Sequence, residues 1–331
     1  MNILITGAAG FIGSALAVEL LKSGNKVTGI DSLEPYYSEA LKRRRVEDFL
    51  DSNEISFTKL DLTNLAKLRD YVDEHRPDTI IHLAAQPGVR LPVQENYRYS
   101  SANLVGFSNI IQVAIEAGVT DFLYASSSSI YGGNSGGSVE SQTKPNPSSY
   151  YGATKLANEI LAESLKVHQI RMRALRLFTV YGPYGRPDMA YFKLMTSGKL
   201  GQEFHLYGDG SVTRDFTYIS DVTKIVTELV YELRTRPMHF HDRVNLGGSM
   251  PRSMSELIKI TQSYSNNVIR VMSREKQVLD VESTLADPTY LYSLIKYRHQ
   301  IDLEAGLRLF TEWFDSFSIQ DIQRWKFNEI K

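Results

Sequence analysis

The first fourteen residues, MNILITGAAGFIGS, place three glycines between a short apolar run and a helical pattern. Residues 2–6 predict a β-strand, and Gly7, Gly10 and Gly13 form a GxxGxxG turn that opens the helix. The first glycine of such a turn permits a tight bend, the second lets a pyrophosphate approach the backbone, and the third lets helix and strand pack closely. The free amides of the first helical turn, at Phe11 and Ile12, would face that anion. This strand, turn and helix predict a dinucleotide-binding α/β sheet.

The rest of the first half repeats this alternation of strand and helix. Strands are expected at 2–6, 25–30, 55–59, 78–83, 120–125 and 171–176, and helices at 11–24, 38–50, 64–75, 103–117 and 150–166. After about residue 177 the pattern becomes irregular and rich in glycine, proline and aromatic residues. We therefore predict an α/β protein with a Rossmann-type doubly wound parallel sheet over 1–177. A smaller C-terminal α/β substrate-binding domain is expected over 178–331, with some chain interleaving between the two.

Composition excludes several classes of function. The 37 basic and 38 acidic side chains nearly cancel, so no bulk positive field favours nucleic acid or an acidic membrane. The chain has no cysteine, and the two histidines of HFH (239–241) have no third ligand at a suitable spacing, so no metal site is expected. The N-terminus resembles a strand rather than a signal peptide, and no apolar run approaches the ~20 residues of a membrane span. A cytoplasmic location is expected.

The predicted second strand, KVTGID, ends in an acidic residue, Asp31. A carboxylate at the end of this strand would accept hydrogen bonds from the ribose hydroxyls of an adenosine. It would repel a 2′-phosphate, so the sequence favours NAD over NADP as cofactor.

A tyrosine and a lysine four residues apart, Tyr151 and Lys155, lie in the segment SSYYGATKLANEIL and would share one face of a helix. A tyrosine hydroxyl has an ordinary pKa of about 10, and a neighbouring ammonium favours the phenolate. Such a pair can therefore act as an acid and base near neutral pH. Tyr150 has Thr154 in the place of a lysine, so Tyr151 is the better candidate.

Together the GxxGxxG turn, the serine cluster of YASSSSIYG (124–132) and Tyr151-x-x-x-Lys155 resemble the extended short-chain dehydrogenase/reductase family of nucleotide-sugar epimerases and dehydratases. The resemblance extends over nearly the whole chain. It includes DLTN (61–64), IIHLAAQPGVR (80–90), NLVGF (103–107), RDFTYISDV (214–222) and NLGGS (245–249).

This resemblance implies roles for further residues. Asp61 and Leu62 would lie along the adenine, Ala84 and Ala85 along the cofactor backbone, Lys155 on the nicotinamide ribose, Ser127 in a triad with Tyr151 and Lys155, and Asn103 in the supporting network. The family also implies a homodimer in which helices 103–117 and 150–166 form a four-helix bundle.

The serine cluster bears on the choice of reaction. Family members share the oxidation of a sugar alcohol by tyrosinate and NAD. Those that eliminate water carry an Asp-Glu pair at the positions of Ser128 and Ser129, and decarboxylating relatives carry a glutamate at the second. An epimerase needs neither acid, because the ketosugar only turns over and is reduced on its other face. Uncharged Ser128 and Ser129 therefore favour an epimerase and are expected to contact the substrate.

The segment RLFTVYGPYGRPDMAYFK (176–193) resembles the corresponding segment of UDP-glucuronate 4-epimerases. An asparagine usually occupies the place of Thr179 in hexose 4-epimerases, and nothing there matches Arg186. A guanidinium binds a carboxylate through two parallel hydrogen bonds, and a threonine hydroxyl can add a third. The resemblance thus implies NAD-dependent interconversion of UDP-glucuronate and UDP-galacturonate.

Contacts to the rest of the UDP-sugar follow from the same resemblance. Arg90 would contact the sugar or a phosphate, Tyr207 the uracil, Arg214 the diphosphate and Asp280 a ribose hydroxyl, with Arg274 the nearest candidate for a second diphosphate arginine. Three alternatives remain open at this point: a UDP-glucose or UDP-N-acetylglucosamine 4-epimerase, a UDP-glucuronate decarboxylase, and an NAD-sensing regulator without catalysis.

Overall fold

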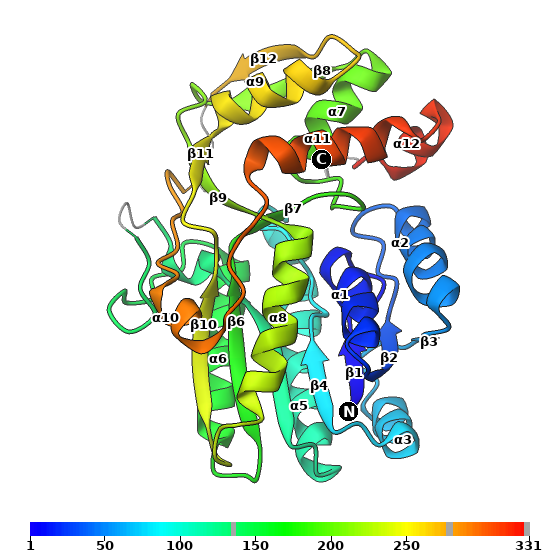
Figure 1. Cartoon of the computed structure of the whole chain (residues 1–331), viewed down its shortest axis with the longest axis vertical. Coiled ribbons are helices and arrows are strands. Elements are labelled where there is room, and N and C mark those ends of the chain that lie inside the picture. The colour runs from blue at the N-terminus through cyan, green and yellow to red at the C-terminus, as the bar shows by residue number, and fades with distance from the viewer. Residues whose placement is uncertain (134–136, 276–280, 328–331) are drawn as a thin grey trace.

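Seven parallel strands form the central sheet of the computed structural model, which describes residues 1–133, 137–275 and 281–327 (Figure 1). Their order is β10-β6-β5-β4-β1-β2-β3. The strands are β1 (Asn2–Thr6), β2 (Lys26–Asp31), β3 (Ser56–Lys59), β4 (Thr79–His82), β5 (Asp121–Ser127), β6 (Arg171–Leu177) and β10 (His241–Leu246). The doubly wound fold class predicted from the sequence is confirmed.

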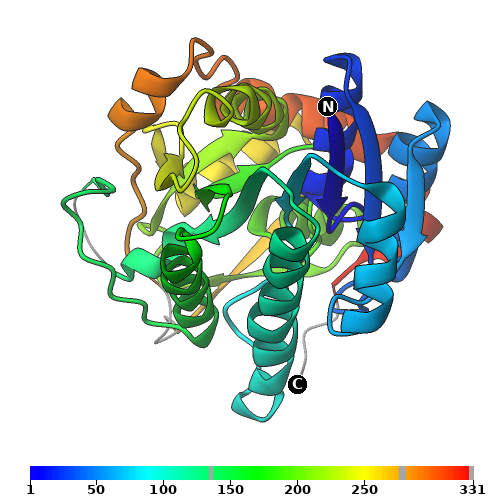
Figure 2. The same ribbon diagram turned by 90° about the horizontal axis from the view of Figure 1, so that it is seen from below.

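Both faces of the sheet are covered by helices. The helices α1 (Phe11–Lys22) and α8 (Ile219–Leu233) lie on one face, and α3 (Leu65–His75), α5 (Gly106–Glu116) and α6 (Tyr150–Leu165) lie on the other (Figure 2). Because side chains alternate along a strand, Ile3 and Ile5 of β1 belong to one core cluster and Leu4 to the other. Burial on both faces explains why these strands are continuous apolar runs in the sequence.

All six strands predicted from the sequence are present, with ends displaced by at most two residues. The helix predicted over 103–117 begins earlier: α4 (Asn96–Tyr99) and a π-helical segment, Ser100–Val105, lead into α5 without a break. The seventh strand, β10, lies in a region that the sequence marked as irregular. Its first three residues, HDR, are polar and hide the strand pattern.

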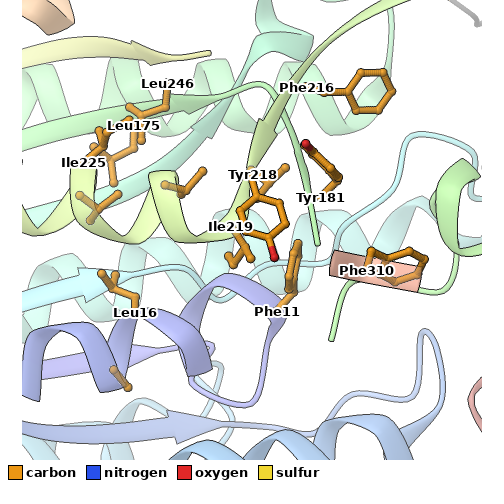
Figure 3. Packing of buried hydrophobic residues seen from close by; sticks show 14 of the residues in the cluster. Phe11, Leu16, Leu175, Tyr181, Phe216, Tyr218, Ile219, Ile225, Leu246 and Phe310 are labelled. Atoms are coloured by element: carbon orange, nitrogen blue, oxygen red, sulfur yellow. The ribbon is translucent and has the colours of Figure 1, made fainter. Parts of the chain in front are cut away.

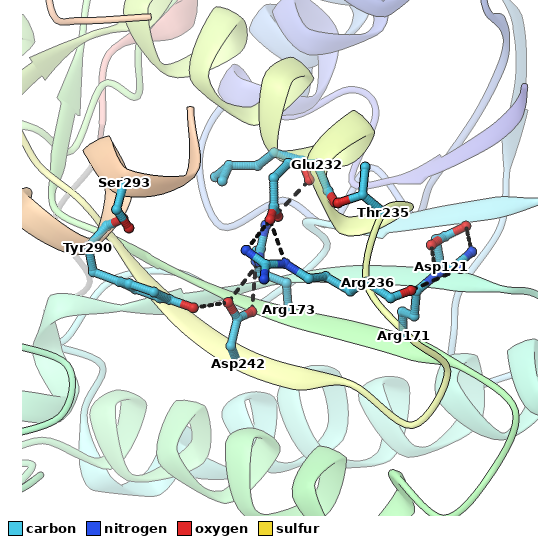
Figure 4. A network of polar contacts seen from close by, with 10 residues as sticks. Asp121, Arg171, Arg173, Glu232, Thr235, Arg236, Asp242, Tyr290 and Ser293 are labelled. Carbon is cyan, nitrogen blue, oxygen red and sulfur yellow. Dashed lines mark hydrogen bonds and ion pairs between the residues drawn. The ribbon is translucent and has the colours of Figure 1, made fainter. Parts of the chain in front are cut away.

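A buried arginine on the neighbouring strand pairs with one of these polar residues, Asp242 (Figure 4). Arg173 of β6 is fully buried and donates through Nε and Nη2 to both carboxylate oxygens of Asp242 on β10, at 2.7 Å each. Its Nη1 atom donates to Glu232 of α8 at 2.5 Å. The hydroxyl of Tyr290 donates to Asp242 at 2.7 Å. The outermost strand of the sheet is therefore fixed by charge as well as by the backbone ladder.

Substitution of Asp242 by alanine is expected to lower the free energy of unfolding by about 3 kcal/mol, because it leaves the guanidinium of Arg173 buried with one carboxylate fewer. A decrease in Tm of about 4 °C would follow for a chain of this size. Urea and thermal unfolding measure it. Glu39→Gln breaks an exposed pair with Arg43 and should change stability by less than about 1 kcal/mol; an equally small effect at Asp242 would contradict the prediction.

The C-terminal elements pack above the carboxyl ends of the sheet strands (Figure 1). A three-stranded sheet contains β7 (Thr179–Tyr181), β9 (Thr213–Tyr218) and β11 (Pro251–Ser253), and β8 (Glu203–Tyr207) pairs with β12 (Arg270–Arg274). The helices there are α7 (Ala190–Leu200), α9 (Met254–Tyr264), α11 (Leu303–Asp315) and α12 (Ile319–Trp325), while α2 (Glu39–Arg45) and α10 (Thr289–Leu294) lie beside the main sheet.

One continuous core joins these elements to the main sheet. Phe11 of α1 and Ile219 of α8 lie close to Tyr218 and Tyr181 of the smaller sheet, and Phe310 of α11 extends the cluster (Figure 3). Within the described residues, no helix is long and apolar enough to cross a membrane.

Candidate active site

A cleft of about 1090 Å³ lies between the main sheet and the C-terminal elements. It is lined by most of the predicted site residues: Gly7, Gly10, Phe11, Ile12, Gly13, Asp31, Asp61, Leu62, Ala84, Ala85, Arg90, Ser127, Ser128, Ser129, Tyr151, Lys155, Thr179, Arg186, Tyr207 and Arg214. Asp280 lies outside the described residues. Arg274 is described but does not line the cleft.

The glycine turn is required by packing as well as by the cleft. Gly7 has φ +76°, and a Cβ atom there would lie 2.7 Å from the backbone nitrogen of Ala84. A Cβ atom on Gly10 or Gly13 would lie 2.8 or 2.2 Å from the carbonyl oxygen of Gly7. The helix α1 has no side-chain cap and no acidic residue in its first turn. Its first amides therefore remain available to an anion in the cleft.

Two carboxylates follow strands on the same side of the cleft. Asp31 ends β2, is 8% exposed, and accepts a hydrogen bond from the amide of Leu33 through Oδ1 at 2.7 Å. Asp61 follows β3 and accepts from the amide and hydroxyl of Thr63 through Oδ1, at 2.8 Å each. Each turn thus fixes its carboxylate through one oxygen and leaves Oδ2 without a partner among the described residues.

At the opposite end of the cleft, α6 directs two side chains toward the end of β5. Lys155 is buried, and its Nζ atom donates to the carbonyl of Ala125 at 2.8 Å. The hydroxyl of Tyr151 hydrogen-bonds with that of Ser127. The neighbouring Tyr150 does not line the cleft and contacts Ser100 instead, at 2.6 Å. The structure therefore brings together Tyr151, Lys155 and Ser127, as the sequence predicted.

The electrostatic environment of Tyr151 includes an unexpected cation. Burial raises the pKa of the Tyr151 hydroxyl, whereas the charge of Arg186 and the hydrogen bond with Ser127 act to lower it. Burial also lowers the pKa of Lys155 to about 8. The sequence assigned the tuning of Tyr151 to Lys155, whose Nζ lies 5.9 Å from the tyrosine ring centroid. The lowering influences found among the described residues are those of Arg186 and Ser127.

The burial of Lys155 has a measurable cost in stability. The unfolded chain keeps this proton up to pH 10.5 and the folded chain only to about pH 8, so between these values the unfolded state binds more protons and stability rises with pH. Lys155→Met should increase the free energy of unfolding at pH 7 by about 2 kcal/mol, after the lost hydrogen bond to Ala125 is subtracted. This gain should vanish by about pH 10.5. Urea unfolding of Lys155→Met from pH 7 to 10.5 tests this prediction, with the exposed Lys166→Met as the control. A gain in stability that does not depend on pH would contradict the prediction.

The four serines of the cluster have different contacts. Ser126 donates to Glu159 at 2.6 Å, and Glu159 forms a buried ion pair with Arg176. Ser127 accepts from the amide of Ser129 at 3.1 Å and so caps the short 3₁₀ segment Ser128–Tyr131. Ser128 and Ser129 line the cleft without adding charge, and no acid occupies either position.

Asn103 supports this end of the cleft from the π-helical segment. Its Oδ1 atom accepts from the amide of Gln86 at 2.8 Å, and its Nδ2 atom donates to the hydroxyl of Thr154 at 3.1 Å. Thr154 in turn donates to the carbonyl of Tyr151 at 2.8 Å. This chain connects the loop after β4 with the first turn of α6.

The sequence did not indicate the partners of Arg186. Its Nε and Nη2 atoms donate to the two carboxylate oxygens of Asp188 at 3.0 and 2.5 Å. The hydroxyl of Tyr36, from the segment after β2, donates to the same carboxylate at 3.5 Å. Thr179 begins β7 and lines the cleft with them. Two loops 150 residues apart in sequence form this cluster, so no local pattern could reveal it.

The remaining predicted residues lie toward β8 and β9. The guanidinium of Arg90 lies 5.9 Å from the ring centroid of Tyr207, at the end of β8. Arg214 of β9 donates to the carbonyl of Thr213 at 2.8 Å. Arg274 pairs with Tyr207 in the strand register and contacts His205 at 3.4 Å.

One cleft contains a glycine turn with free helix amides, the carboxylates of Asp31 and Asp61, and the Tyr151, Lys155 and Ser127 group. Together these features define the chain as a dinucleotide-binding protein with an acid–base centre. The model of the NAD dependent epimerase/dehydratase family matches residues 3–247, and the chain belongs to this family.

Individual relatives cover nearly the whole chain. An uncharacterized protein of Methanocaldococcus jannaschii is 38% identical over 318 aligned positions, and the alignment covers 95% of this chain and 96% of that protein. The probable UDP-glucuronate 4-epimerase of Rhizobium meliloti is 35% identical over 332 aligned positions, and the alignment covers 95% of this chain and 97% of that protein. The crystal structure of the Bacillus cereus UDP-glucuronic acid 4-epimerase with UDP-glucuronic acid and NAD has a TM-score of 0.88 at 32% identity, covering 96% and 99%.

Proposed function

We propose that this protein is an NAD-dependent 4-epimerase that interconverts UDP-glucuronate and UDP-galacturonate. The observation that carries the proposal is that Arg186 and Tyr151 line the same cleft. The charge of Arg186 acts on the Tyr151 hydroxyl and opposes the rise in its pKa that burial causes. In a uronate, C4 bears the hydroxyl to be oxidised, and the C6 carboxylate is attached to the adjacent C5. A uronate in the cleft would therefore need a base for the C4 hydroxyl and a cation for the carboxylate, and the cleft offers Tyr151 and Arg186 for these two roles.

The residues of the cleft fit NAD. The amides at the start of α1 would hold the pyrophosphate, Asp31 the adenosine ribose, Asp61 and Leu62 the adenine, and Lys155 with Tyr151 the nicotinamide ribose. Ala84 and Ala85 would follow the cofactor backbone. When bound, NAD supplies the reversible oxidation at C4 that the chain itself cannot perform.

The chain supplies the proton transfer and the positioning. Tyr151 takes the proton of the C4 hydroxyl and returns it after the ketosugar has turned over, while Ser127 hydrogen-bonds O4. The buried ammonium of Lys155 would stabilise the tyrosinate and, with NAD bound, would hold the nicotinamide ribose. Toward the nucleotide, Arg214 binds the diphosphate, Tyr207 lies against the uracil, and Arg90 contacts sugar or phosphate.

Oxidation at C4 also creates a hazard. The 4-ketouronate is a β-keto acid: its C5–C6 bond can break, the electron pair entering the enolate at C4 and C5 while CO₂ leaves. This requires the C5–C6 bond to stand perpendicular to the ketone plane. Arg186 and Thr179 bind the carboxylate and keep it out of that orientation, and uncharged Ser128 and Ser129 offer no acid to assist elimination.

Incubation of the purified protein with UDP-glucuronate, followed by NMR of the sugar, tests the proposal. The galacto isomer should appear. A UDP-pentose with CO₂ release would instead indicate a decarboxylase, and no change with UDP-glucuronate but conversion of UDP-glucose or UDP-N-acetylglucosamine would indicate a hexose epimerase. A protein that binds NAD and changes none of these sugars would instead indicate an NAD-sensing regulator without catalysis.

Ser127→Ala should decrease kcat about a hundredfold, because it removes the hydroxyl shared with Tyr151 and O4. Ser129→Ala is the matched control from the same cluster and should change kcat less than fivefold, since Ser129 contributes its backbone amide to the turn. Steady-state rates by coupled assay distinguish the two; equal, small effects would make the cluster a structural loop.

We further propose a homodimer through the α5 and α6 face. These helices pack side by side (Figure 2). Ile160 (63% exposed) and Leu161 (40%) of α6, and Val105 (48%) just before α5, leave apolar side chains in solvent. Light scattering should give twice the chain mass, and Ile160→Glu should give the monomer. A monomeric wild type would refute this arrangement.

The cytoplasmic location stays a prediction.

A further inference from the structure

We propose that Asp188 is a positioning residue that fixes which edge of the Arg186 guanidinium is offered to the sugar carboxylate. The inference rests on the proposed function, because it concerns how a uronate is held. Asp188 would set the orientation of the guanidinium rather than the affinity for the sugar. Loss of orientation would increase the release of CO₂, whereas loss of affinity would raise KM.

A guanidinium has two edges that can bind a carboxylate with two parallel hydrogen bonds. One consists of Nε and Nη2, and Asp188 occupies it in the structure at 3.0 and 2.5 Å. The other, formed by Nη1 and the second hydrogen of Nη2, has no hydrogen-bond partner among the described residues. With its Nε edge taken, the guanidinium cannot rotate about its stem without breaking two hydrogen bonds, so only its end faces the sugar.

Asp188 is itself held in place. Its side chain is only 10% exposed, and the hydroxyl of Tyr36 contacts it at 3.5 Å. Tyr36 is confined by the backbone at Gly88, where a Cβ atom would lie 2.3 Å from the tyrosine oxygen, and by the ring of Phe327, whose centroid is 5.5 Å away. The segment that follows Asp31 thus helps to fix the proposed carboxylate-binding arginine.

The charge balance decides what Asp188 contributes. The Arg186–Asp188 pair is neutral, so a bound uronate places a second carboxylate on one cation. Asp188 therefore opposes the binding of an acidic sugar by electrostatic repulsion while it restricts the direction of the guanidinium. A residue whose role was to strengthen binding of the acidic sugar would not place a second negative charge beside Arg186. A residue that fixes the direction of the guanidinium, and so keeps the C6 carboxylate out of the perpendicular orientation, can carry that charge.

The test compares Asp188→Asn with the wild-type holoenzyme on UDP-glucuronate. Wild type must first produce the galacto isomer; if it does not, the proposed function fails before this inference is reached. For Asp188→Asn we expect a KM no higher than that of wild type, because a like charge is removed, and at least a tenfold increase in CO₂ released per epimerisation, because the guanidinium can swing. Asp188→Glu keeps the charge but displaces the guanidinium, so its KM should stay within threefold while CO₂ release also increases.

Asp48→Asn is the matched control, because Asp48 forms the same combination outside the cleft, with Arg44 at 2.6 Å and Tyr184 at 2.5 Å. It should leave both KM and CO₂ release unchanged. A tenfold higher KM for Asp188→Asn without additional CO₂ would make Asp188 a contributor to binding and overturn the inference. Wild-type values for both quantities in a folded Asp188→Asn or Asp188→Glu would overturn it as well.

Discussion

Replacement of Tyr151 by phenylalanine is expected to reduce turnover of UDP-glucuronate at least a thousandfold, because the substitution removes the hydroxyl that we propose exchanges a proton with the C4 oxygen. The ring keeps its packing, so binding of the UDP-sugar should change less than threefold. Single-turnover NMR and calorimetric titration with UDP-glucuronate measure the two effects separately.

Tyr150→Phe is the natural control for that experiment. Tyr150 occupies the preceding position of the same helix but contacts Ser100 outside the cleft, so its loss should change kcat less than threefold. If Tyr151→Phe kept a tenth of wild-type activity, another group would have to serve as the base.

The second large effect concerns Arg186. Arg186→Ala should raise KM for UDP-glucuronate roughly 30- to 150-fold, since hydrogen bonds to a charged group contribute about 2–3 kcal/mol. Inhibition by UDP-glucose, which lacks the carboxylate, should change less than threefold, and this comparison separates carboxylate recognition from a general disturbance of the cleft. Inhibition constants and KM values from one coupled assay suffice.

Arg186→Lys makes the prediction sharper. A lysine keeps the positive charge but cannot bind a carboxylate through two parallel hydrogen bonds. We therefore expect KM to recover only in part and the release of CO₂ during turnover to remain above that of wild type. Unchanged kinetics of Arg186→Ala on the uronate would remove Arg186 from the substrate site.

Features that depend on residues close together in the sequence could be predicted well. The strand β1 could be predicted from the apolar run Ile3, Leu4 and Ile5, because both faces of this strand are buried. The glycine turn could be predicted because Gly7, Gly10 and Gly13 approach neighbouring backbone closely. Tyr151 and Lys155 could be paired because helix geometry fixes side chains four residues apart.

What depends on distant segments could not be predicted in this way. The strand β10 begins with polar residues whose partners, Arg173 and Glu232, lie on other elements. The Tyr36–Asp188–Arg186 cluster, and with it the charge beside Tyr151, exists only when two loops far apart in sequence meet.

The position of β10 in the sheet has a consequence for synthesis on the ribosome. Its neighbour β6 ends at residue 177, but β10 begins only at residue 241, so an emerging chain exposes one edge of the main sheet while more than sixty further residues are made. During that interval the guanidinium of Arg173 has no Asp242 to pair with. The nascent nucleotide-binding half should therefore be unstable and prone to association until β10 arrives, and stretches of slow translation before residue 246 should lower the yield of folded protein more than stretches after it.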